Sequence, residues 1–123
     1  MGKPGATGLT RVKDSFFYSL AGLRAAFREE AAFRQECALA LVMVPVAFWL
    51  GQTAAEISLL IASVLLVLII ELINSAMEAI VDRVGTGHHE LSGRAKDIGS
   101  AAVFVSMLLT ATVWILIAAE RFL

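Results

Sequence analysis

Three long apolar segments constrain this chain more than any other feature. Residues 57–70 contain no charged side chain, and further uncharged runs occupy residues 37–50 and 98–119. Hydrophobic residues make up 59% of the 123 residues, whereas soluble domains typically contain about 45–50%. A soluble core of this size could not bury so much apolar surface, so we expect an integral membrane protein.

The spacing of apolar and polar residues predicts one all-α membrane domain over residues 1–123. Spans are expected at about residues 33–50, 57–81 and 98–119, each close to the roughly 20 residues that a bilayer requires. Between Val12 and Phe27, apolar residues recur every three or four positions, with basic residues on the other faces. This pattern predicts an amphipathic helix on the membrane surface at about residues 10–28. The alternative is a helix packed on another protein element.

Lysine and arginine predict the orientation of the spans, because cytoplasmic loops carry most of these residues. Of ten in the chain, one lies near the C-terminus and three lie in a polar connection at residues 82–97. The other six precede the first span: Lys3, Arg11, Lys13, Arg24, Arg28 and Arg34. The N-terminus and the polar connection should therefore be cytoplasmic. Trp49 and Trp114 then fall near the outer boundary, as residues of an aromatic belt would.

A stripe of polar residues at the end of the second span carries most of the chemical information. Glu71, Asn74, Glu78 and Asp82 are spaced three, four and four residues apart, which places them on one face of a helix. Carboxylates at membrane depth cost at least about 2.5 kcal/mol each, so they indicate partners, water or a ligand. Helix–helix hydrogen bonding would explain Asn74 alone, but three carboxylates on one stripe favour a functional site.

A second acidic cluster lies at the start of the first span, where residues 29–36 read EEAAFRQE. Glu30 and Arg34 have the spacing of a helical ion pair, and Glu36 lies deeper. Since this cluster shares its expected depth with the acids at 78 and 82, carboxylates from two helices could hold a hard divalent cation.

A third cluster lies in the 82–97 connection, which contains His88-His89-Glu90 and Arg94-Ala95-Lys96-Asp97. Its basic side chains could bind nucleotide phosphates, or could simply anchor the cytoplasmic side. The adjacent histidines are a weak metal signal, because neighbouring residues do not share a helix face.

Several classes of site are excluded. The chain has no P-loop, GxGxxG, HRD, DFG or GxSxG motif, so phosphoryl transfer would need a site of another design. A net charge of −1 gives no electrostatic case for nucleic acid. The single Cys37 excludes an internal disulfide and a zinc site built on cysteine pairs.

Four stretches resemble the prokaryotic diacylglycerol kinases, which are small bacterial inner-membrane enzymes. They are GLRAAF at 22–27, EAAFRQE at 30–36, ELINSAMEAIVDR at 71–83 and HELSGRAKDIGSAAV at 89–103. Together the resemblance extends over about residues 8–119. It implies a homotrimeric helix bundle that transfers the ATP γ-phosphoryl group to diacylglycerol, giving phosphatidate, with composite sites between subunits.

The resemblance also implies roles for individual residues. Glu71 looks like the general base, and Glu30 and Glu78 look like ligands of the nucleotide's Mg²⁺. Residues similar to ATP contacts are Tyr18, His89, Lys96 and Asp97, supported by Asn74 and Asp82. Residues similar to the lining of the lipid and nucleotide pocket are Arg11, Ser19, Gln35, Glu36 and Ser100.

Three positions depart from the family pattern. Glu29 stands where relatives often have a neutral Asn, so its extra charge puts the expected metal affinity in question. Gly87 and His88 stand where relatives carry other residues, which puts nucleotide contacts at these two positions in question. Three other functions remain open: an undecaprenol kinase of the same family, a small proton-coupled transporter, and a non-catalytic helix-bundle scaffold. Transporters of that kind usually have four spans and little cytoplasmic loop, which argues against the second.

Overall fold

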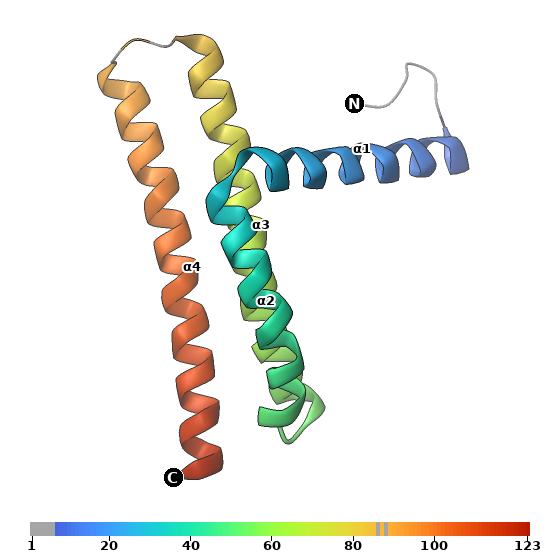
Figure 1. The fold of residues 1–123 in the computed structure, drawn as a ribbon, viewed down its shortest axis with the longest axis vertical. Coiled ribbons are helices and arrows are strands. Elements are labelled where there is room, and N and C mark those ends of the chain that lie inside the picture. Colours follow the sequence, from blue (N-terminus) through green and yellow to red (C-terminus); the bar gives the residue numbers. More distant parts are fainter. Residues whose placement is uncertain (1–6, 86, 88) are drawn as a thin grey trace.

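The computed structural model contains four helices: α1 (Gly8–Glu29), α2 (Ala31–Leu50), α3 (Ala54–Val84) and α4 (Glu90–Phe122) (Figure 1). It describes residues 7–85, 87 and 89–123. Lys3, counted above for the orientation, and His88, considered as a weak metal ligand, lie outside the described residues.

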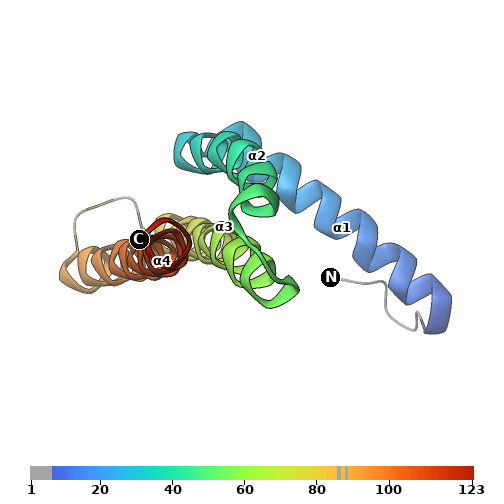
Figure 2. The same cartoon turned by 90° about the horizontal axis from the view of Figure 1, so that it is seen from below.

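Helices α2, α3 and α4 run alongside one another, whereas α1 extends sideways from the start of α2 (Figure 1). Viewed along the bundle, α3 lies between α2 and α4 (Figure 2), and it packs far more extensively on both than they do on each other. The three bundle helices are long and apolar enough to cross a membrane. The expected all-α membrane fold with three spans is therefore confirmed.

Helices α3 and α4 are longer than the sequence indicated. The polar connection expected at residues 82–97 is mostly helical, because α3 continues to Val84 and α4 begins at Glu90. The Nδ1 atom of His89 accepts a hydrogen bond from the backbone N–H of Leu91 at 3.1 Å, which satisfies one free donor at the start of α4. Glu90 and Arg94 also form an i,i+4 ion pair at 3.9 Å. Residues 90–97 thus form a polar extension of the third span.

A polar seam joins α3 to α4 inside the bundle. The indole Nε1 of Trp114 donates to Ser63 Oγ at 3.1 Å, and Thr110 Oγ1 donates to the Ser63 carbonyl at 3.0 Å. Such hydrogen bonds between helices satisfy these polar groups within an apolar surrounding. The half-buried side chain of Trp114 therefore joins α4 to α3.

The ends of α2 and α4 distant from α1 are also joined. The guanidinium of Arg121 donates to the carbonyl oxygens of Trp49 and, at 2.9 Å, Leu50, and its carbon Cζ lies 5.1 Å from the centroid of the Trp49 ring. A cation at the carbonyl end of a helix is favourable. Helix α2 itself continues as one helix through Pro45.

Candidate active site

The acidic stripe on α3 follows a gradient of burial. Glu71 and Asn74 are 6% and 9% exposed, Glu78 is half-buried, and Asp82, one turn further on, is exposed. The stripe therefore begins inside the bundle and ends in the open near the connection to α4.

Glu71 lies in a concentration of negative charge. The carboxylates of Glu30 and Glu78 are close enough for their charges to act on it, and Glu36 on α2 lies near it as well. Within the described part of the chain, no lysine or arginine forms an ion pair with any of these four carboxylates. Uncompensated carboxylates packed together are unfavourable unless they bind a cation or a proton.

Arg34 explains why Glu30 is left without an ionic partner. Its Nη1 atom donates to the carbonyl oxygens of Phe27 at 2.8 Å and Arg28 at 3.0 Å, which caps the last turn of α1. The i,i+4 pairing of Glu30 with Arg34, considered from the sequence, is therefore not formed. Glu30 itself is the non-helical residue between α1 and α2, with φ −117° and ψ 109°.

The additional charge at Glu29 is largely compensated. Its carboxylate pairs with the Nε atom of Arg28 at 3.0 Å on the exposed side of α1. Exposed pairs of this kind contribute little stability, but this one lowers the net charge that Glu29 adds beside Glu30. Gly87, the other departure that the structure describes, is exposed in the α3–α4 connection.

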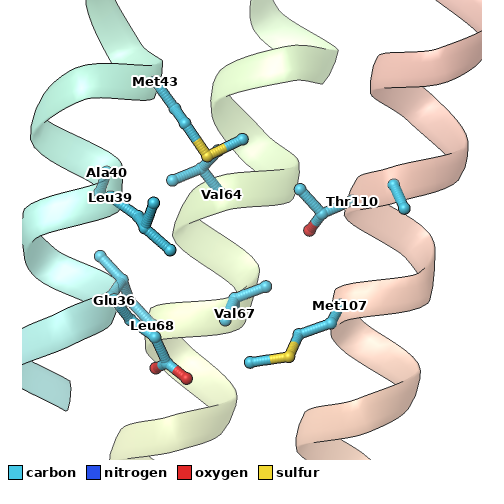
Figure 3. A pocket seen from close by; sticks show the side chains of 10 residues that line it. Glu36, Leu39, Ala40, Met43, Val64, Val67, Leu68, Met107 and Thr110 are labelled. Atoms are coloured by element: carbon cyan, nitrogen blue, oxygen red, sulfur yellow. The ribbon is translucent and has the colours of Figure 1, made fainter. Parts of the chain in front are cut away.

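Glu36 lies at one end of an apolar groove between α2, α3 and α4 (Figure 3). The groove has a volume of about 300 Å³ and is lined mainly by aliphatic and methionine side chains, with Met43 at the opposite end. Glu36 is 9% exposed, and its Oε2 atom has no hydrogen-bond partner among the described residues. A buried acceptor without a partner is costly, so a donor at this end of the groove would be stabilised.

A second, wider groove separates α1 from α3. Its volume is about 610 Å³, and its walls are mostly small side chains, with Glu29 and Glu30 at the α1 end. Ser19 lines it from α1, and Leu72, Ser75 and Ala79 line it from α3. Helix α1 therefore crosses α3 within two turns of Glu71, and Glu78 and Asp82 lie at or beyond this crossing.

The start of α4 brings basic residues to the same stripe. Lys96, which precedes the expected span at 98–119, forms an ion pair with Asp82, with Nζ 2.7 Å from Oδ1. This hydrogen bond and the charge of Asp82 raise the pKa of Lys96, so Lys96 remains protonated. At His89, Nδ1 acts as an acceptor, which leaves the proton on Nε2, where it can be donated to a ligand. Asp97 is exposed.

The other predicted site residues are not gathered around Glu71 in a single chain. Arg11 and Tyr18 are exposed on α1, whose first half projects away from the bundle (Figure 1). Gln35 and Ser100 are also exposed, on α2 and α4. One chain thus assembles the carboxylates with Lys96, and leaves the remaining candidates on open surfaces.

Comparison with known proteins agrees with these features. The model of the family described as prokaryotic diacylglycerol kinase matches residues 17–118. The chain belongs to the prokaryotic diacylglycerol kinase family. The diacylglycerol kinase of Haemophilus influenzae is 56% identical over 108 residues, covering 88% of this chain and 92% of the relative. That of Escherichia coli is 50% identical over 116 residues, covering 94% and 95%. That of Pseudomonas aeruginosa is 54% identical over 110 residues, covering 89% of each.

Membership in the prokaryotic diacylglycerol kinase family confirms the resemblance and the kinase class expected from the four stretches. Sequence reasoning missed two features beside the acidic stripe. Ser75 lines the α1–α3 groove, and Gly99 lies against Asn74 where α4 meets α3. Small residues are typical of close helix contacts in membranes, and the run GSAA at residues 99–102 carries that signal.

Proposed function

We propose that this protein phosphorylates diacylglycerol with ATP, giving phosphatidate for phospholipid biosynthesis at the cytoplasmic face of the bacterial inner membrane. The observation that carries the proposal is Glu71, buried on α3 beside Glu30 and Glu78 without an ionic partner among the described residues. A carboxylate held in this way is available to accept a proton.

Glu71 acts as the general base. It takes the proton of the lipid hydroxyl as that oxygen attacks the γ-phosphorus of ATP. A new oxygen–phosphorus bond forms, the bond between the γ-phosphorus and the β–γ bridging oxygen breaks, and ADP leaves. With α1 on the membrane surface, the groove that it forms with residues 72–79 of α3 supports lateral access of a lipid hydroxyl to Glu71 at membrane depth.

Glu30 and Glu78 hold the Mg²⁺ of the nucleotide. Both carboxylates lie near Glu71 and lack an ion-pair partner in the described segments, which fits hard oxygen ligands. Among the described residues, no three acidic, His or Cys side chains are placed to hold a metal ion together, and Mg²⁺ typically uses one or two carboxylates together with substrate phosphates. When bound, the ion neutralises phosphate charge during transfer.

The nucleotide lies along the start of α4. Lys96 provides a fixed positive charge for phosphate, and the Nε2–H of His89 provides a donor. Asp97 and Tyr18 complete the contacts, while Asn74 and Asp82 support Glu78 and Lys96 through hydrogen bonds at 3.4 Å and 2.7 Å.

The lipid enters laterally, with Arg11, Ser19, Gln35, Glu36 and Ser100 lining the combined lipid and nucleotide pocket. Ser19 already lines the α1–α3 groove, and Glu36 lies at the end of the apolar groove with an oxygen that has no partner in the described part of the chain. An apolar channel with a few polar groups at one end suits a lipid with a hydroxyl head.

The working enzyme is a homotrimer with sites shared between subunits. The exposure of Arg11, Tyr18 and Ser100 supports this arrangement, because a neighbouring subunit can bring these residues to the acidic stripe.

The test is an assay of purified wild-type protein in detergent–lipid micelles with radiolabelled ATP and Mg²⁺. Diacylglycerol and undecaprenol are offered separately, and the labelled lipid product is identified. Labelled phosphatidate supports the proposal, whereas selective labelling of undecaprenol assigns the chain to the other acceptor. No labelled lipid, together with proton uptake into proteoliposomes, would support the transporter instead.

A further inference from the structure

Gly99 of α4 lies directly against the acidic stripe of α3. A Cβ atom at this position would overlap the amide oxygen of Asn74 and lie 2.5 Å from Cε of Met77, although carbon atoms normally remain about 3.5–4.0 Å apart. Gly99 follows Lys96 by one helical turn. Helix α4 therefore meets the stripe at two successive levels, first through the Lys96–Asp82 ion pair and then through Gly99 and Asn74.

Asn74 is held in one orientation at this contact. Its side chain is buried, and its Oδ1 atom is buried without a hydrogen-bond partner among the described residues. Its Nδ2 atom donates to Glu78 Oε1 at 3.4 Å. If the amide turned over, its oxygen would face the carboxylate, and two acceptors would be opposed. The hydrogen bond therefore sets which end of the amide faces Glu78, and the missing side chain at Gly99 leaves the room that this position of the amide needs.

We propose that Gly99 is a positioning residue, which acts through Asn74 to fix the carboxylate of Glu78. The inference rests on the proposed function, because there Glu78 holds Mg-ATP. A Cβ at position 99 would also meet Met77, but this contact would not displace Glu78. The end of a methionine side chain is flexible and can move aside. Asn74 has no such freedom, because any rotation that clears position 99 also moves its hydrogen bond to Glu78.

The test compares Gly99→Ala with Gly85→Ala, the same substitution in the α3–α4 connection. A Cβ at Gly85 meets no atom within 4 Å, and its extended backbone accommodates any residue. With saturating lipid, we expect Gly99→Ala to lower kcat/KM for Mg-ATP by about 10- to 100-fold, as small displacements of site residues do, whereas Gly85→Ala leaves it near wild type. A decrease of the same size in both variants would overturn the inference.

A double-mutant cycle separates positioning from general damage. Asn74→Ala removes the amide that Gly99→Ala would displace, so the double variant should be no worse than Asn74→Ala alone. Repeating the cycle with Met77→Ala should leave the full effect of Gly99→Ala in place. Additive losses with Asn74→Ala would overturn the inference. If Gly99→Ala does not fold, folding should return when Asn74→Ala is added, and failure to return would also count against it.

A readout without catalysis distinguishes this inference from the proposed function. The side-chain amide resonance of Asn74, assigned by its loss in Asn74→Ala, should shift in Gly99→Ala and remain in place in Gly85→Ala. An unchanged resonance in Gly99→Ala would overturn the positioning role even if the protein is an active kinase. A shifted resonance in a protein that does not phosphorylate lipid would leave the positioning of Glu78 intact and overturn the kinase proposal alone.

Discussion

Lys96 of α4 and Asp82 of α3 form an ion pair 2.7 Å long that joins the two helices where they leave the bundle. Their side chains are 44% and 63% exposed, and exposed pairs contribute about 0–1 kcal/mol to stability. The pair therefore stabilises the fold only slightly, and its main effect is to direct the Lys96 ammonium toward the acidic stripe.

Lys96→Met should consequently change nucleotide binding far more than stability. A charge-assisted hydrogen bond contributes about 1.5–3 kcal/mol, so the KM for ATP should rise by about 10- to 100-fold, with little change in Tm. Asp82→Asn serves as the comparison, since it frees Lys96 without removing its charge and should affect KM less. Kinetics at varied ATP and thermal unfolding in the same micelles measure both. A large loss of Tm with normal KM would make the residue structural.

Glu71→Gln should remove catalysis while keeping nucleotide binding. Glutamine preserves the size and most of the hydrogen bonding of Glu71 but cannot accept the hydroxyl proton. Turnover should therefore fall by about 10²–10⁴-fold, the range for a lost general base. ATP affinity should change little, because Glu71 is not assigned to the nucleotide. Turnover and nucleotide binding are measured on one preparation, and near-normal turnover would exclude Glu71 as the base.

Glu30→Gln and Glu78→Gln should each raise the Mg²⁺ concentration needed for activity. Loss of one charged ligand costs about 1.5–3 kcal/mol, which corresponds to an increase of about 10- to 100-fold. Glu120→Gln is the matched control, because Glu120 is exposed near the end of α4. The measurement is a Mg²⁺ titration at fixed ATP. Wild-type activity of either site variant at low Mg²⁺ would contradict the assignment.

Mixed oligomers test whether sites are shared. Arg11 and Tyr18 lie on the projecting half of α1, while Glu71 and Glu78 lie on one face of α3. Mixing Glu71→Gln subunits with an inactive Arg11→Ala/Tyr18→Ala variant should restore activity, to about a quarter of wild type if each site combines α1 and α3 of neighbouring subunits. A mixture of Glu71→Gln and Glu78→Gln should restore none, because both residues come from one helix. Equal recovery in both mixtures would contradict this division of the site.

The orientation can be tested by cysteine labelling in a Cys37→Ala background. A membrane-impermeant maleimide added to intact spheroplasts should label cysteines introduced at Thr53 and Phe122. It should label one introduced at Gly87 only after the membrane is opened. The reason is the strong excess of Lys and Arg on the side of the N-terminus. Labelling in the opposite pattern would reverse the orientation.

The sequence by itself determined the class of fold and the acidic stripe. Three apolar segments of about the length that a bilayer requires predict helical spans, and the spacing from Glu71 to Asp82 places four polar groups on one helix face whatever the tertiary structure. The four family stretches likewise predicted the kinase class, because each is a continuous sequence motif that can be recognised without the tertiary structure.

Only the tertiary structure decided which groups meet across helices. Arg34 could pair with Glu30 by spacing, but it caps α1 instead, because the chain leaves the helix at Glu30. Trp114 could face lipid, but it donates to Ser63 of α3. Gly99 carries no side chain to mark it, and its contact with Asn74 depends on how closely α4 approaches α3. Distances between helices follow from packing of the whole bundle, which no local spacing specifies.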